Sequence, residues 1–183
     1  MEKSQNGRFA VFVAAGVVSG VICWSGLFFI PEGSIWLRIY PGVVFGLVLF
    51  AVGQFYQLNR RRSRAYPLIV IVAASIAGWW AAPGIGFVYG RPVPMLTAGA
   101  FGALIVALGL IGAWGVRKRI GSFLLLITIT GALGGQIAQL LWDYSPQLDD
   151  DLWTLILFIE WQSLVMIAVA VATRWSTHLS SRN

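Results

Sequence analysis

Glu160 is the residue of this chain whose type and position most strongly suggest chemistry, because it interrupts a long apolar run. It lies eight residues after the start of that run at Leu152, or about 12 Å deep at about 1.5 Å per helical residue. A carboxylate at the centre of a membrane helix costs roughly 2.5–3.5 kcal/mol to insert. We therefore expect Glu160 to face the bundle interior or a wet cavity. It would be either a proton or cation site or a neutral group that hydrogen-bonds two helices together.

The preceding apolar run carries polar side chains at helical spacing. Thr128, Gln136, Gln139 and Asp143 fall on one stripe of a helix. Gln136 lies about 9 Å from the end of its run, close to the depth of Glu160. Because consecutive spans run antiparallel, we predict a hydrogen bond between Glu160 and Gln136. Two interpretations stay open for the stripe, namely a polar path that narrows inward or simple contacts between packed helices.

Two arginines are the only basic residues in the loops on the side of the bundle where the acidic residues gather. Arg38 and Arg91 are each followed by a proline three positions later, which favours a rigid presentation. Together with Asp143 they are candidates for the outer mouth of a path, since a guanidinium suits capture of a carboxylate or another anion. The alternative is that both arginines pair with nearby acidic residues or with lipid phosphate.

The residue types argue against most enzyme chemistry. The one histidine, His178, lies in the tail, and the one cysteine, Cys23, lies inside the first apolar run. These counts leave no set of histidines or cysteines for a metal site and no disulfide framework. The apolar runs hold no lysine or histidine for a Ser-His-Asp or Ser-Lys arrangement. We therefore predict a protein that is not an enzyme and that binds no metal or cofactor.

The elements that must position these residues are membrane helices. Of 183 residues, 58% are hydrophobic and only 11% are charged, and the mean hydropathy is +0.78. We expect an all-α fold in which one integral membrane domain, residues 1–183, forms a polytopic bundle of six transmembrane helices. The expected spans are about 9–30, 41–58, 66–82, 95–116, 120–142 and 152–173.

The loops between the spans alternate between basic and acidic. The basic ones carry Arg60, Arg61, Arg62, Arg64, Arg117, Lys118 and Arg119. By the positive-inside rule we expect both termini to be cytoplasmic, in the inner membrane of a bacterium. The same clusters are candidates for binding lipid head groups or a partner. The net charge of +6 is explained by this orientation signal, so no nucleic acid partner is expected.

Two spans share the pattern Phe-Gly-x4-Ala-aliphatic-Gly, at residues 45–53 and 101–109. This pattern indicates either a duplicated helical hairpin or the recurrence of small residues in a tightly packed bundle. We predict a small transporter or transporter membrane subunit, with a polar path lined by Glu160 and Gln136. The alternative is a non-catalytic accessory or structural subunit of a larger membrane complex. The expected partners are membrane lipids, with a membrane protein partner or a homo-oligomer left open.

Overall fold

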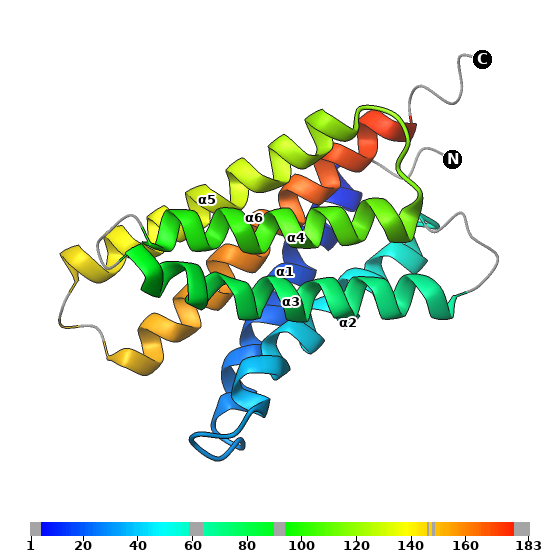
Figure 1. Ribbon diagram of the computed structural model, residues 1–183. Helices are drawn as coiled ribbons and strands as arrows, with labels where there is room; N and C mark the ends of the chain where they lie inside the picture. Colours follow the sequence, from blue (N-terminus) through cyan, green and yellow to red (C-terminus); the bar gives the residue numbers. More distant parts are fainter. Residues whose placement is uncertain (1–4, 59–63, 90–93, 146, 148, 178–183) are drawn as a thin grey trace.

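The computed structural model describes residues 5–58, 64–89, 94–145, 147 and 149–177 (Figure 1). All regular structure within these residues is helical, and each of the six helices is long and apolar enough to cross a membrane. The expectation of a six-helix bundle without strands is confirmed for this part of the chain. The helices are α1 Gln5–Leu27, α2 Trp36–Phe55, α3 Ala65–Tyr89, α4 Pro94–Trp114, α5 Ile120–Tyr144 and α6 Asp150–Thr177.

The largest differences from the expected spans lie at the ends of α2 and α3. The helix α2 begins at Trp36 rather than at Pro41, so the proline lies inside the helix in its second turn. A proline there is tolerated because it disrupts only one backbone hydrogen bond near a helix start. The helix α3 continues to Tyr89 instead of ending near Ala82, which makes it 25 residues long.

The six helices pack in a closed ring. Each helix contacts the next one along the chain, and α6 returns to contact α1. The start of α1 and the end of α6 lie at one end of the bundle, as expected for six antiparallel spans (Figure 1). The tip of the α1–α2 hairpin extends away from the other helices at the opposite end. This ring order decides which of the candidate residues can meet.

Glycines set the closeness of the helix pairs, as the α1–α6 contact shows. A Cβ added at Gly16 would lie 2.6 Å from the Ser163 Cα atom, and one added at Gly20 would lie 2.7 Å from the Ile159 Cα atom. Side chains at these two positions would push the α6 backbone away. The Gly-x-x-x-Gly spacing is the known signature of close helix pairs in membranes. It therefore explains why α1 lies against α6 rather than only against α2.

The same spacing recurs in two further helix pairs. Gly42 and Gly46 of α2 contact the α3 backbone, and Gly131 and Gly135 of α5 contact the α4 backbone. Three of the six contacts in the ring are thus made through a glycine pair four residues apart. Such close approach maximises dispersion contact between backbones, which is the main attraction available to helices in lipid.

The two repeated sequence patterns do not make equivalent contacts. Gly46 of the first pattern contacts α3 at Val72 and Ser75, whereas Gly102 of the second contacts α3 at Gly78. A duplicated hairpin would place Gly102 against α5, because α5 would correspond to α3. The contacts therefore favour the reading that small residues recur wherever helices approach closely.

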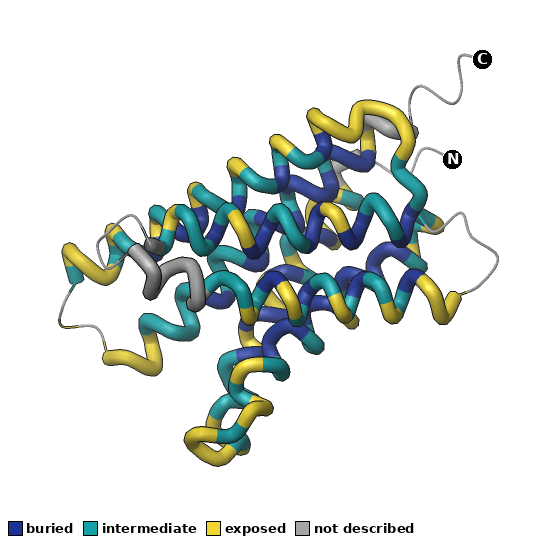
Figure 2. The backbone as a smooth tube through the Cα atoms, viewed as in Figure 1, coloured by how far each residue is buried: buried dark blue, intermediate teal, exposed yellow. Residues whose placement is uncertain are grey.

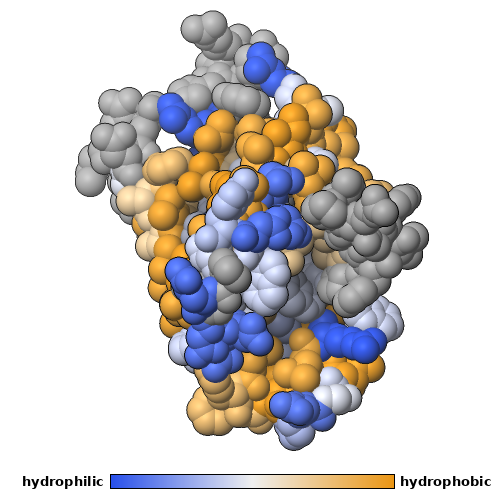
Figure 3. Space-filling model, turned by 90° about the vertical axis from the view of Figure 1, so that its left-hand side faces the viewer, coloured by the Kyte–Doolittle hydropathy of each residue, from blue (hydrophilic) through white to orange (hydrophobic). Residues whose placement is uncertain are grey.

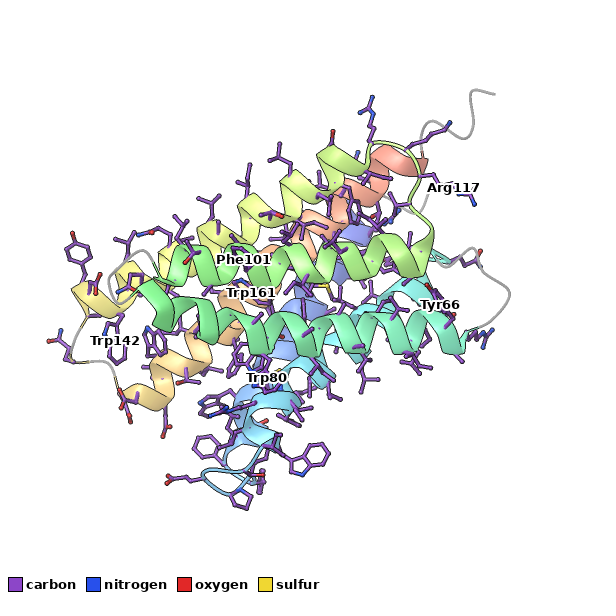
Figure 4. The ribbon with its side chains drawn as sticks, viewed as in Figure 1. Tyr66, Trp80, Phe101, Arg117, Trp142 and Trp161 are labelled. Atoms are coloured by element: carbon purple, nitrogen blue, oxygen red, sulfur yellow. The ribbon has the colours of Figure 1, made fainter. Side chains whose placement is uncertain are left out.

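The interior of the ring is filled by aromatic side chains of α6. Trp161 packs against Phe45 of α2 with ring centroids 5.7 Å apart, and Phe158 stacks on Trp79 of α3 at 5.0 Å. Figure 4 shows Trp161 in the middle of the bundle, between the helices. Figure 2 shows the buried residues concentrated along the inward faces of the helices. The ring centre is therefore a packed core in the described residues around Trp161.

The two ends of the bundle carry opposite charge. We call the end that holds both termini the basic end, since its described charged residues are Arg8, Arg64, Arg117, Lys118, Arg119 and Arg174. The other end is the acidic end, with Glu32, Asp143, Asp149, Asp150 and Asp151. Arg117 and Trp142 mark the two ends in Figure 4. Figure 3 looks at the acidic end and shows hydrophilic side chains gathered there within a hydrophobic surround.

Candidate functional site

The helix α6 is recessed between its neighbours α1 and α5. No residue from Trp153 to Thr173 is classed as exposed, whereas every other helix has several exposed apolar side chains. Both α1 and α5 pack against α6, and the two flanking helices share no extensive contact with each other. The outward side of α6 therefore lies between α1 and α5, and we call this strip of the α6 surface the recess and its residues the recess floor. Glu160 lies near the middle of this floor.

The Glu160 carboxyl group has no hydrogen-bond partner among the described residues. Both of its oxygens are buried, although the side chain as a whole remains partly exposed. It lies on the α5 side of the recess, because a Cβ added at Gly134 would be 3.4 Å from Glu160 Oε1. The absence of a side chain at Gly134 leaves room for the carboxyl group. A buried polar group without a partner costs roughly 1–3 kcal/mol, and more when it is charged.

The predicted hydrogen bond between Glu160 and Gln136 is wrong. Glu160 lies beside Gly134, and Gln136 follows two residues later in the same helix. Two residues turn an α-helix through about 200°, so Gln136 points to the far side of α5 from the carboxyl group. The depth argument was sound, but depth alone does not fix the direction in which a side chain points.

The rest of the α5 stripe lies away from Glu160 for the same reason. Gln139 Nε2 donates to Asp143 Oδ1 over 2.9 Å, one turn further along the stripe. Thr128 Oγ1 is buried without a partner in the described residues. The structure therefore places Thr128, Gln136, Gln139 and Asp143 on one helix face, as the spacing predicted, but does not join them to Glu160.

The candidates for an outer mouth are spread over the ring. Arg38 is exposed near the start of α2, and Asp143 is exposed near the end of α5. In the ring order α2 lies across from α5, so these two side chains lie on different sides of the acidic end. Arg91 lies outside the described residues. Of the basic candidates, Arg64, Arg117, Lys118 and Arg119 are exposed at the basic end, and Arg60, Arg61 and Arg62 lie outside the described residues.

A polar group in the α1–α6 contact was missed by the sequence reasoning. Gln162 is only 1% exposed and donates from Nε2 to Cys23 Sγ over 3.3 Å. The Cys23 thiol in turn lies 3.6 Å from the Pro41 carbonyl oxygen, its acceptor. Gln162 Oε1 and Ser19 Oγ are buried without a hydrogen bond to the described residues. The Gly16–Gly20 spacing was the available signal, because it indicates which face of α1 contacts another helix.

Comparison of the chain with known protein families, with curated proteins and with solved structures finds no match. The six apolar helices are compatible with an integral membrane protein that crosses its membrane several times. Any more specific function must be argued from the residues themselves.

Proposed function

We propose that this chain is a non-catalytic accessory subunit that seats a helix of a partner membrane protein in the recess between α1 and α5. The observation that carries the proposal is the Glu160 carboxyl group, whose two oxygens have no hydrogen-bond donor in the described part of the chain. Once the carboxyl group rotates away from Gly134, a partner helix with a hydroxyl, amide or cationic side chain at this depth would supply the missing donor. The proposed setting is a bacterial inner membrane, with the basic end in the cytoplasm.

Two features of the bundle favour binding over conduction. The ring centre is filled by Trp161 and Phe158, which pack against aromatic rings of α2 and α3. A solute pathway usually needs a wider polar lining than these apolar side chains offer. The recess, in contrast, lies on the outer side of α6, and interhelical hydrogen bonds in membranes contribute roughly 0.6–2 kcal/mol each. Binding a helix there would both cover α6 and satisfy Glu160.

Site-directed photocrosslinking in native membranes tests this proposal. A photoreactive amino acid at Ile156, one turn before Glu160 on the recess floor, should form one discrete adduct with a different membrane protein. The same amino acid at Leu108, a 51% exposed residue of α4, should not form that adduct. Leu108 faces lipid on the other side of the bundle, so it controls for random collisions.

The dependence of the adduct on Glu160 separates this proposal from general hydrophobic contact. Glu160→Leu should lower the yield of the Ile156 adduct, because losing one interhelical hydrogen bond weakens binding by about 3- to 30-fold. Gln136→Leu should leave it intact because Gln136 points away from the recess. An unchanged adduct yield in Glu160→Leu, or an adduct formed only between two copies of this chain, would overturn the proposal.

The second candidate is a small transporter, in which Glu160 and Gln136 line a polar path and Glu160 carries a proton or cation. It is supported by further buried polar atoms at the level of Glu160 on α6 that have no partner among the described residues, namely Trp161 Nε1, Gln162 Oε1 and Ser163 Oγ. Water or a moving ion would satisfy such atoms. In liposomes with an imposed pH gradient, this candidate predicts proton flux that Glu160→Gln abolishes. The accessory proposal predicts no flux for either protein.

A further inference from the structure

The guanidinium group of Arg8 is held in a fixed position at the basic end. Its Cζ atom lies 5.8 Å from the centroid of the Phe12 ring and 5.0 Å from that of the Tyr56 ring. The two rings stack on each other at 5.5 Å, and Phe12 is fully buried. Arg8 Nη2 donates a hydrogen bond of 2.8 Å to Thr173 Oγ1. Residues of α1 and α6, together with Tyr56 just after the end of α2, thus fix the orientation of one cation.

The α6 backbone determines whether the Thr173 hydroxyl donates to Arg8 or accepts from it. The Thr173 hydroxyl lies 2.8 Å from the Val169 carbonyl oxygen and 3.1 Å from that of Ala170. Because its single proton is directed to these carbonyls, the hydroxyl oxygen can only accept from Arg8. The neutral hydroxyl orients the guanidinium group but does not neutralise its charge.

No described carboxylate is near enough to balance Arg8. Every acidic side chain in the described ranges except Glu160 lies at the acidic end, and Glu160 lies at mid-depth in α6. Arg174, which follows Thr173, adds a second positive charge that acts on Arg8. Arg8 Nε is buried and has no acceptor among the described residues. A half-buried guanidinium beside another cation is stabilised by an anion as its counter-ion.

We propose that Arg8 and Arg174 bind the phosphate group of an anionic membrane lipid at the basic end. A guanidinium matches the geometry of phosphate oxygens with two parallel donors, and basic sites between membrane helices are suited to lipid head groups. The surroundings favour a lipid over free phosphate, because Phe9, the next residue of α1, is 44% exposed. An acyl chain would pack on this exposed ring, which is one residue along α1 from the cation. The site is independent of the recess that holds Glu160.

Lipid retention measured by native mass spectrometry of the protein in neutral detergent tests the site. Phosphatidylglycerol should be retained by the unaltered chain, and phosphatidylcholine should be retained far less because its net charge is zero. Arg8→Gln should weaken phosphatidylglycerol retention about tenfold or more, since charge-assisted hydrogen bonds are lost. Arg174→Gln should weaken it less, and this exposed position offers a second variant that does not disturb the core.

Matched controls at the same end separate a site from general attraction to positive charge. Arg64→Gln and Arg117→Gln remove the same charge from exposed positions and should change retention by less than about twofold. Equal loss in all four variants would overturn the proposal, as would equal retention of the two lipids. Complete displacement of the lipid by millimolar inorganic phosphate would also overturn it, because the site would then bind free phosphate.

Discussion

Because α1 and α6 lie so close together, we predict that Gly20→Ala lowers the stability of the protein through a steric clash, and the structure gives the size of that clash. The added Cβ would lie 2.7 Å from both the Cα and the N atom of Ile159. Ordinary contact begins near 3.4 Å, so the two helices must separate by about 0.7 Å. A gap of that size loses a quarter to a half of the dispersion energy of each contact along the interface. We expect a loss of roughly 1–3 kcal/mol of stability, as for other overpacked sites.

The matched control is Gly121→Ala in α5. Gly121 lies in a helix as Gly20 does, but an added Cβ there has no atom within 4 Å. Gly20→Ala gains helix propensity of up to about 1 kcal/mol in the helix interior, and Gly121→Ala gains less because Gly121 is the second residue of α5. The difference between the two variants is therefore a lower limit for the steric penalty. Gly121→Ala should therefore be neutral or slightly stabilising. At about 2–4 °C per kcal/mol for a chain of this size, the two melting temperatures should be clearly separate.

The chain carries its own reporter for this experiment. Cys23 is the only cysteine, is fully buried, and lies three residues from Gly20 in the same contact with α6. Thermal unfolding in mild detergent can thus be followed with a fluorogenic maleimide as well as by tryptophan fluorescence. Gly16→Ala should also destabilise, and the double variant should cost less than the two single ones together, because one separation of the helices relieves both clashes. Equal melting of Gly20→Ala and Gly121→Ala, or fully additive losses, would refute the reasoning.

Three further predictions follow from the core and from the charges at the two ends. Trp161→Ala should lower the free energy of unfolding by roughly 3 kcal/mol or more, because the central core contacts are lost; a smaller loss in the same melts would contradict the packed interior. Gln162→Met should change stability by less than about 1 kcal/mol, since it removes a buried oxygen without a described partner and only one weak hydrogen bond, to Cys23 Sγ, while the volume is kept; a large loss would show that the amide group makes stronger bonds than these. In a Cys23→Ser background, an impermeant maleimide should label Tyr144→Cys in intact cells and Arg64→Cys only after lysis, and the reverse pattern would contradict the predicted orientation.

The sequence predicts the number and approximate limits of the helices, because the length of an apolar run can be read from composition alone. It does not predict which helices pack against each other, because that depends on small residues at particular positions. The glycine pairs at Gly16–Gly20 and Gly131–Gly135 contain that information, yet a single sequence does not say which helix each pair contacts. The ring order resolves this by placing α6 between α1 and α5.

The sequence predicts how deep the candidate residues lie in the membrane, but not the direction in which their side chains point. Glu160 was identified correctly as a residue inside a span, and its lack of a described partner was not foreseen. Gln136 was chosen as its partner because both residues lie at similar depths on antiparallel helices. The choice failed because Gly134, and not Gln136, is the α5 residue beside the carboxyl group. The direction of a side chain depends on how its helix is turned about its own axis, and packing against the neighbouring helices fixes that rotation. Counting residues along a span gives only the depth of the side chain.

Four consecutive residues of α6, from Glu160 to Ser163, each have a buried polar atom without a partner among the described residues. Because successive residues are about 100° apart, they point toward different surroundings: Glu160 toward α5, Trp161 toward the ring centre and Gln162 toward α1. The neighbouring helices keep these polar atoms away from lipid, but their described residues supply no hydrogen bonds to them. Apolar residues of similar size would be at least as stable at such positions. Stability therefore does not explain this run of polar residues. A partner helix on the outer side of α6 would account for Glu160, whereas Trp161 and Gln162 lie inside the bundle, out of its reach.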